Sequence, residues 1–240
     1  MWKNINIEKC LSHINQQRAS FDGTPPGSKP SITISRMCGA GGRSVASKLA
    51  EYLQGNAFSG GQWTIFDQAL IEKVLSDHML STRLAEFLPE SSASPLSEVL
   101  TKIRHGRPSM SEIVEQTVET IWRLAASGHV ILVGRGSNVI TAGMRNVFHV
   151  RLVGSFERRV ERVEEVYELG RLAAQSFIKS QDAGRKNYLR DYFGRDINDP
   201  ELYHLTVNTD RIAYGDAAKL IGDTVINWFK SPRPLMAKSA

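Results

Sequence analysis

Short apolar runs separated by longer amphipathic segments recur along most of the chain. Five of these runs are rich in β-branched residues and predict strands at 32–35, 63–66, 130–133, 147–153 and 203–207. Their apolar content is continuous rather than alternating, which is typical of strands buried on both faces of a parallel sheet. The segments between them carry apolar residues at helical spacing, as in Val45, Leu49 and Leu53. Helices are therefore expected to cover the sheet.

This alternation predicts an α/β fold in which residues 31–230 form one domain around a doubly wound, five-stranded parallel sheet. Ser94 followed by proline, and capping-box spacing from Ser109 to Glu112, predict that the middle of the chain is a helical insertion. Residues 1–30 are interpreted as a short amphipathic helix and a Gly/Pro/Ser linker, and 231–240 as a C-terminal tail. Ligands of such sheets bind at the carboxyl ends of the strands, so candidate chemistry is expected there.

Composition narrows the class of protein. The chain has 240 residues, of which 41% are apolar and 23% charged, and these fractions exclude global disorder. No apolar run approaches the roughly 18 to 20 residues that span a bilayer, and the polar start has no signal-peptide core. Two cysteines are too few for a disulfide framework. These features predict a soluble protein of the reducing cytoplasm with no membrane contact.

Positive charge is concentrated in one segment. The net charge is +5, and residues 170–195 contain six Lys or Arg against two Asp. This density is low for a nucleic-acid groove, and aromatic residues are not interleaved with the basic ones as such grooves require. A small phosphorylated ligand is the better match, and no nucleic-acid partner is expected.

A glycine-rich turn follows the first predicted strand and leads into a helix, an arrangement that lets backbone N–H groups converge on phosphate oxygens. The N–H groups predicted to bind phosphate are those of Gly39, Ala40, Gly41, Gly42, Arg43 and Ser44. In the usual G-x-x-x-x-G-K-[ST] loop, the lysine reaches the β- and γ-phosphates and the hydroxyl holds Mg²⁺. Here Arg43 takes the lysine position and Met37 the first glycine position. From the residues alone, a turn that binds nothing remains an alternative, and Cys38 is interpreted as a packed thiol rather than a nucleophile.

With two later motifs, this loop resembles the cytidylate kinase-like family, a branch of the phosphate-loop nucleoside monophosphate kinases. The resemblance covers about Ser31 to Phe229. It rests on the Ser35-Arg36…Gly39-Ala40-Gly41-Gly42-Arg43 loop, on Val133-Gly134-Arg135-Gly136, and on Asp182-Ala183-Gly184-Arg185, which is similar to a lid motif. It implies a phosphate-loop kinase fold with a helical acceptor-binding insertion and a lid at about residues 170–195.

The same resemblance implies the roles of individual residues. ATP and Mg²⁺ would be the cofactors, with Ser44 as the metal ligand and with Arg43, Arg135 and Arg185 in catalysis. Asp67, Arg135, Asp182 and Arg185 would bind the acceptor, since the family's lid aspartate approaches the acceptor sugar and its lid arginine bridges the transferring phosphate. From the residues alone, Arg135 could instead cap a turn, and Asp182 and Arg185 could be a solvated helix pair.

The predicted function is ATP-dependent phosphoryl transfer to a nucleoside monophosphate, with CMP or dCMP as the acceptor. Two alternatives remain: a non-catalytic nucleotide-binding regulatory module, and a kinase of another small phosphate acceptor. They are motivated by Arg43 and Met37 in the loop, by Gly136 where cytidylate kinases have an aspartate, and by Ile178 where they have an arginine. The sequence predicts no particular oligomeric state.

Overall fold

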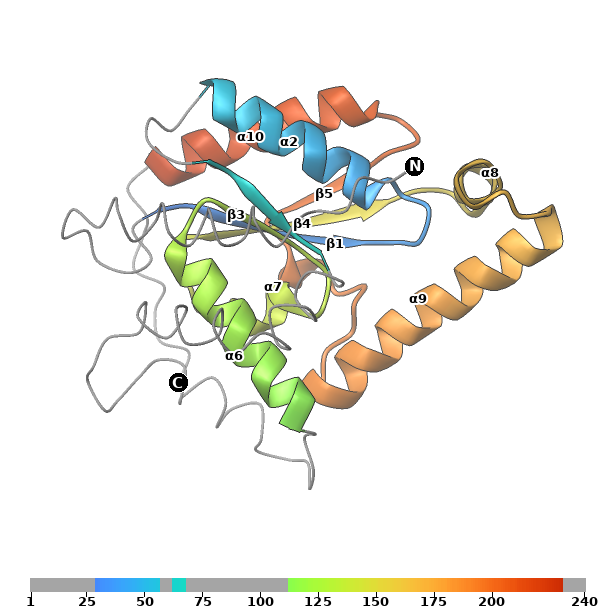
Figure 1. Ribbon diagram of the computed structural model, residues 1–240, viewed down its shortest axis with the longest axis horizontal. Helices are drawn as coiled ribbons and strands as arrows, with labels where there is room; N and C mark the ends of the chain where they lie inside the picture. Colours follow the sequence, from blue (N-terminus) through green and yellow to red (C-terminus); the bar gives the residue numbers. More distant parts are fainter. Residues whose placement is uncertain (1–28, 57–61, 68–111, 231–240) are drawn as a thin grey trace.

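A computed structural model describes residues 29–56, 62–67 and 112–230 (Figure 1). In these residues five strands form one all-parallel sheet in the order β2-β3-β1-β4-β5. The strands are β1 (Ser31–Arg36), β2 (Thr64–Phe66), β3 (Val130–Val133), β4 (Val147–Val153) and β5 (Leu205–Asn208). The predicted α/β fold with a five-stranded parallel sheet is therefore confirmed.

Helices cover both faces of the sheet (Figure 1). On one face lie α2 (Gly42–Asn56) and α10 (Tyr214–Lys230), and on the other lie α6 (Glu112–Ser127) and the short α7 (Ser137–Ile140). The apolar stripe predicted at Val45, Leu49 and Leu53 therefore lies on a helix, α2. The predicted helical insertion falls mostly within 68–111, which lies outside the described residues, as do most of the N-terminal appendage and all of the C-terminal tail.

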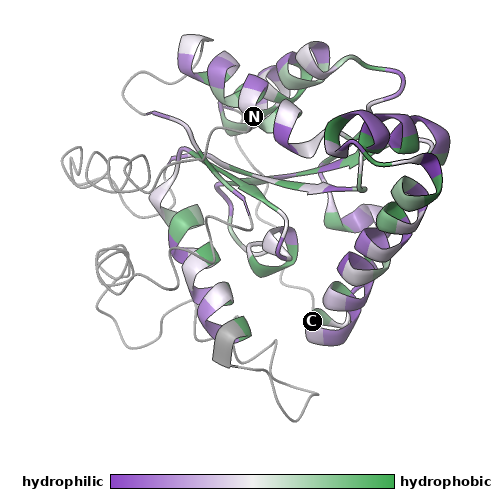
Figure 2. Cartoon of the chain, turned by 45° about the vertical axis from the view of Figure 1, so that its right-hand side comes forward, coloured by the Kyte–Doolittle hydropathy of each residue, from purple (hydrophilic) through white to green (hydrophobic). Residues whose placement is uncertain are grey.

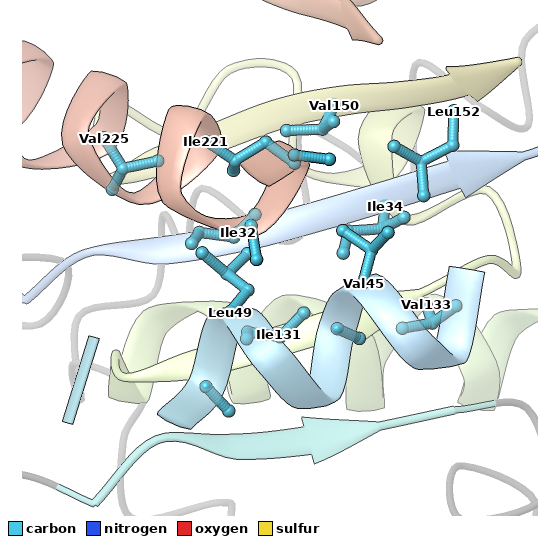
Figure 3. Packing of buried hydrophobic residues seen from close by; sticks show 14 of the residues in the cluster. Ile32, Ile34, Val45, Leu49, Ile131, Val133, Val150, Leu152, Ile221 and Val225 are labelled. Atoms are coloured by element: carbon cyan, nitrogen blue, oxygen red, sulfur yellow. The ribbon is translucent and has the colours of Figure 1, made fainter. Parts of the chain in front are cut away.

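The main core lies between the sheet and the α2–α10 layer. Val45 and Leu49 of α2 and Ile221 and Val225 of α10 point toward the apolar side chains of the three central strands (Figure 3). All four of these helix residues are fully buried. Figure 2 shows the same division, with hydrophobic residues gathered where helices and strands meet and hydrophilic ones over the outer helix surfaces. This packing fixes the helix that begins directly after the glycine-rich turn.

β1 is buried on both faces although its residues alternate between apolar and polar. Ile32 and Ile34 face the main core, whereas Ser31 and Thr33 are buried toward the other face. The Ser31 hydroxyl donates to a backbone carbonyl of α6, and the Thr33 hydroxyl lies 2.8 Å from Nδ1 of His149. The prediction of continuously apolar strands is thus wrong for β1. Hydrogen bonds satisfy its buried polar face.

Two further helices stand beyond the carboxyl ends of the strands, α8 (Phe156–Tyr167) and α9 (Arg171–Phe193) (Figure 1). The second of these occupies the segment predicted as the lid. A 3₁₀ turn, η1 (Pro200–Leu202), then leads to Tyr203, which precedes the last strand rather than belonging to it as predicted. The Tyr203 hydroxyl donates to the carbonyl of Ile197 at 2.8 Å, so this bond lies within the segment that connects α9 to β5. Within the described residues, none of the helices has the length and apolar character needed to cross a lipid bilayer.

Buried histidines predict that the fold is less stable in acid. Burial lowers the pKa of His149 to about 3 and that of His129 to about 4. Between pH 6.5 and about 4 the unfolded chain therefore binds more protons than the folded one, so the free energy of unfolding should fall as pH drops through this window. In His129→Asn the slope between pH 6 and 5 should be smaller by up to about 1.4 kcal/mol per pH unit. Asn is a suitable replacement because the backbone of residue 129 is left-handed, with a φ of 53°, and Asn adopts this conformation more readily than most residues.

Urea unfolding of both proteins at pH 7.5, 6 and 5 measures this difference. Parallel pH profiles for wild type and His129→Asn would contradict the assignment of a neutral, buried imidazole at position 129.

Candidate active site

The turn between β1 and α2 depends on bare glycine backbone. Gly39 and Gly41 have φ values of 79° and 75°, in the left-handed region. A Cβ on Gly39 would lie 2.7 Å from the carbonyl oxygen of Arg159, and one on Gly41 would lie 2.3 Å from Cε1 of Tyr214. Side chains at these positions would therefore be strained and would clash. The turn has the close backbone approach that the predicted phosphate loop requires.

The loop amides are not all available to a ligand. The N–H of Cys38 donates to Oδ1 of Asp182 at 2.7 Å, and the N–H of Ala40 donates to the carbonyl of Met37 at 3.2 Å. Among the described residues, no hydrogen bond from the N–H groups of Gly39, Gly41, Gly42 or Ser44 is present. Unpaired N–H donors at a helix start are the type of group that binds anions in proteins. Ala40, a member of the predicted set, has an N–H that already donates within the protein.

Arg43 and Asp67, for which the sequence predicts roles on opposite sides of the reaction, lie in contact. Nη2 of Arg43 is 2.7 Å from Oδ2 of Asp67. The carboxylate is mostly buried at the end of β2, whereas the arginine side chain is half exposed. The arginine in the lysine position thus reaches across the carboxyl edge of the sheet to the end of β2, which β3 separates from β1.

Arg135 sits in a strained turn at the end of β3. Gly134, Arg135 and Gly136 have φ values of 88°, 54° and 69°, so three consecutive residues are left-handed. A non-glycine residue in this conformation costs about 1 to 3 kcal/mol, and such strain is concentrated at functional sites. A Cβ on Gly136 would meet Cε2 of Phe193 at 2.9 Å. An aspartate at this position would therefore be both strained and crowded, which explains the glycine.

Guanidinium groups gather at the centre of the site. Nη1 of Arg36 lies 2.3 Å from where a Cβ of Gly134 would stand, so its side chain covers that glycine. Burial, with the nearby charges of Arg185 and Arg151, lowers the pKa of Arg36 to about 9. Arg36 forms no ion pair among the described residues. Arginines that repel one another at a buried position are stabilised by a bound anion.

Arg151 extends this positive region beneath the surface. It is 5% exposed in the middle of the otherwise mostly apolar β4, and its Nη1 donates to the Ser35 hydroxyl at 2.8 Å. Burial also lowers the pKa of Arg151. A charged residue inside a buried strand was a signal in the sequence that could have identified it.

Asp182 connects α9 to the glycine-rich loop. Its Oδ1 accepts from the N–H of Cys38 and from Nη1 of Arg185 at 3.2 Å, and its Oδ2 accepts from Nη1 of Arg159 at 2.5 Å. The Arg159 guanidinium also donates to the carbonyl of Cys38 at 3.1 Å. Both carboxylate oxygens are thus engaged by the protein, and contact of Asp182 with an acceptor sugar stays a prediction.

An apolar cluster holds α9 against α8 and the loop. Its buried members are Cys38, Val160, Val163, Ala174 and Ile178. Ile178 therefore packs where the resembling family carries an arginine. Burial raises the pKa of the Cys38 thiol, so the interpretation of a packed, unreactive thiol agrees with its surroundings.

Two cavities open at this edge of the sheet. The larger, about 660 Å³, is lined by the phosphate loop together with Arg43, Ser44 and Asp67. The smaller, about 360 Å³, is lined by the Gly134–Gly136 turn and by one side of α9. The residues that line both are Arg36, Gln181 and Arg185. The structure thus places Arg43, Arg135 and Arg185 around two adjoining spaces, with Arg185 at their junction.

Sequence reasoning missed several cavity residues besides Arg36. Arg162 of α8 lines the larger cavity, donates to the carbonyl of Thr209 at 2.8 Å and stacks on the Tyr214 ring at 5.2 Å. Gln181 lines both cavities next to Asp182 in sequence. Neither has a local sequence signal, because each reaches the cavity only through the packing of α8 and α9.

Comparison with solved structures shows the fold. An uncharacterized protein from Eubacterium ventriosum aligns with a TM-score of 0.65 and 20% identity, covering 83% of this chain and 99% of that one. Shikimate kinase from Bacteroides thetaiotaomicron gives a TM-score of 0.47 at 12% identity, covering 82% and 98%. APS kinase from Mycobacterium tuberculosis, solved with AMPPNP and APS, gives 0.43 at 16% identity, covering 87% and 100%. No curated protein matches the sequence significantly.

A family model matches the sequence itself. The model describes the cytidylate kinase-like family and aligns with residues 31–211, about three quarters of the chain. The match includes the glycine-rich loop, the Gly134–Gly136 turn and α9, so membership supports phosphoryl transfer as the general class of chemistry. The chain therefore belongs to the cytidylate kinase-like family.

Proposed function

We propose that the protein transfers the γ-phosphoryl group of ATP to a nucleoside monophosphate, with CMP or dCMP as the acceptor. The observation that carries this proposal is the junction of the two cavities at Arg36 and Arg185. A donor bound by the phosphate loop and an acceptor bound beside Arg135 would direct their phosphates toward the same two guanidinium groups. Phosphoryl transfer needs this in-line positioning and positive charge more than covalent participation by the protein.

The larger cavity would hold the donor. The unpaired N–H groups at the start of α2 would bind the phosphate oxygens, and Arg43 would add its charge in the lysine position. The Ser44 hydroxyl lines the same cavity, and its oxygen fits Mg²⁺, which prefers oxygen ligands. When bound, Mg²⁺ would neutralise negative charge on the β- and γ-phosphate oxygens. As Arg43 moves to the phosphates, the Asp67 carboxylate would become available to the acceptor.

The smaller cavity suits an acceptor that carries a phosphate. Its described lining contains Arg36, Arg135 and Arg185 and no acidic side chain. A nucleoside monophosphate is largely dianionic near pH 7, because the second pKa of a phosphate monoester is about 6. One of its oxygens can attack the γ-phosphorus, and the bond from that phosphorus to the bridging oxygen of ADP breaks. No general base is needed to deprotonate this nucleophile, whereas an alcohol acceptor would need one.

A coupled assay with ATP-Mg²⁺ against CMP, dCMP, UMP, AMP and GMP tests the proposal. We expect turnover with CMP or dCMP at a kcat within the usual range of about 1 to 100 s⁻¹. Omission of Mg²⁺ should abolish turnover. If the protein phosphorylates only another phosphate-bearing compound, that compound is the acceptor and the nucleoside monophosphate assignment is wrong. If calorimetry detects nucleotide binding but the assay detects no transfer, the protein is a non-catalytic nucleotide-binding module.

A further inference from the structure

One buried polar group at the acceptor cavity makes no hydrogen bond of ordinary geometry with the described residues. Asn138, the second residue of α7, is 3% exposed and lines the smaller cavity. Its amide nitrogen Nδ2 is buried and, in the part of the chain that the structure describes, makes no hydrogen bond of ordinary geometry, although the Asn138 side chain lies close to the Tyr203 hydroxyl. An unpaired buried amide lowers stability. Such a group at a cavity wall is accounted for if a ligand supplies the missing partner.

The lining of this cavity separates into a charged and a neutral set. The charged set consists of Arg36, Arg135 and Arg185. The neutral set includes Asn138, Tyr188, Leu189 and Ile197. Since the acceptor phosphate would bind to the arginines, the neutral residues would contact the uncharged part of the acceptor. Pockets of this kind are mostly apolar, with a few polar groups that set orientation and specificity.

We propose that Asn138 determines acceptor specificity by donating a hydrogen bond from Nδ2 to a carbonyl oxygen or ring nitrogen of the acceptor base. This inference rests on the proposed function, because it requires a nucleotide acceptor. Rotation about the Cβ–Cγ bond, a soft torsion, turns the amide toward the cavity. Gly136 cannot supply this contact, since any side chain there meets Phe193. Asn138, two residues later, supplies a polar group beside the same turn.

Replacement of Asn138 by leucine separates ligand recognition from folding. Leucine has nearly the same volume and no polar atoms, so Asn138→Leu should leave the ligand-free protein as stable as wild type or raise its Tm by about 2 to 4 °C. The same change should lower kcat/KM for the best nucleoside monophosphate by about 10- to 100-fold, with KM for ATP changed less than twofold. Asn138→Asp should lose at least as much, because a carboxylate cannot donate and repels the acceptor phosphate.

Thr141→Val is the matched control. Thr141 is buried at the end of the same helix, and its hydroxyl donates to the carbonyl of Ser137 at 2.6 Å rather than lining either cavity. The Thr141→Val variant should have a slightly lower Tm than wild type and an unchanged KM for the acceptor. If Asn138→Leu does not fold, Asn138→Ala is measured in its place. An Asn138 variant that folds and keeps kcat/KM within threefold of wild type overturns the inference alone. A wild-type protein that phosphorylates no nucleoside monophosphate overturns the proposed function, and this inference with it.

Discussion

Arg185→Ala should lower kcat for phosphoryl transfer by about 10³- to 10⁵-fold, the range found for arginines that stabilise the transferring phosphoryl group. Arg185 lines both cavities, and its guanidinium lies beside Asp182 at 3.2 Å. In the proposed reaction its charge therefore stands where the transferring group passes from donor to acceptor. The fork also binds phosphate through two parallel hydrogen bonds. Arg185→Lys should recover only part of the rate, because an ammonium keeps the charge without the fork.

The measurement is kcat under saturating ATP-Mg²⁺ and acceptor, with Tm recorded for each variant. Arg190→Ala is the control, since Arg190 lies on the same helix in an exposed pair with Asp191; we expect it to keep kcat within twofold. If Arg185→Ala folds normally and retains kcat within tenfold of wild type, Arg185 does not contact the transferring group.

The fold could be predicted because its signals are local. The β-rich runs that became β3 and β4 have the predicted bounds, and the glycine-rich turn joins a strand to a helix as its residues require. The main errors have physical reasons. β1 buries Ser31 and Thr33 through hydrogen bonds to distant elements, and η1 shortens the last strand at its start. Neither feature leaves a periodic pattern in the sequence.

The candidate site could be predicted only in part. Motifs located Arg43, Arg135 and Arg185, because each lies in a short segment of recognisable composition. They did not indicate that Arg43 reaches Asp67, since a side chain at the start of α2 meets one at the end of β2 only when the sheet order places β2 two positions from β1. For the same reason, the proximity of Arg36 to Arg151 depends on the pairing of β1 with β4. Contacts across the sheet edge can be predicted only when the sheet topology is known, and sequence motifs do not supply it.

Asp182→Ala should lower the free energy of unfolding by about 3 kcal/mol, the lower end of the range for breaking a buried ion pair. The Arg159 side chain is 9% exposed and would lose its carboxylate partner, and the Cys38 amide would lose its acceptor. We place the effect at the lower end because Asp182 is itself 30% exposed. Asp182→Asn keeps one acceptor oxygen for the Cys38 amide, so it should lower the free energy of unfolding by less than Asp182→Ala does.

This pair of variants decides between two roles for Asp182. If the carboxylate holds α9 against the phosphate loop, urea unfolding detects the loss for both variants, and ligand-free protein is sufficient for the measurement. If it instead contacts an acceptor sugar, Asp182→Asn should raise the acceptor KM with an unchanged free energy of unfolding. Asp191→Ala, an exposed position on the same helix, should change stability by less than about 0.5 kcal/mol. Arg185 donates to the same carboxylate that holds the loop. Loss of Asp182 should therefore also displace Arg185 from the junction of the two cavities and lower kcat. Asp191→Ala should leave kcat unchanged.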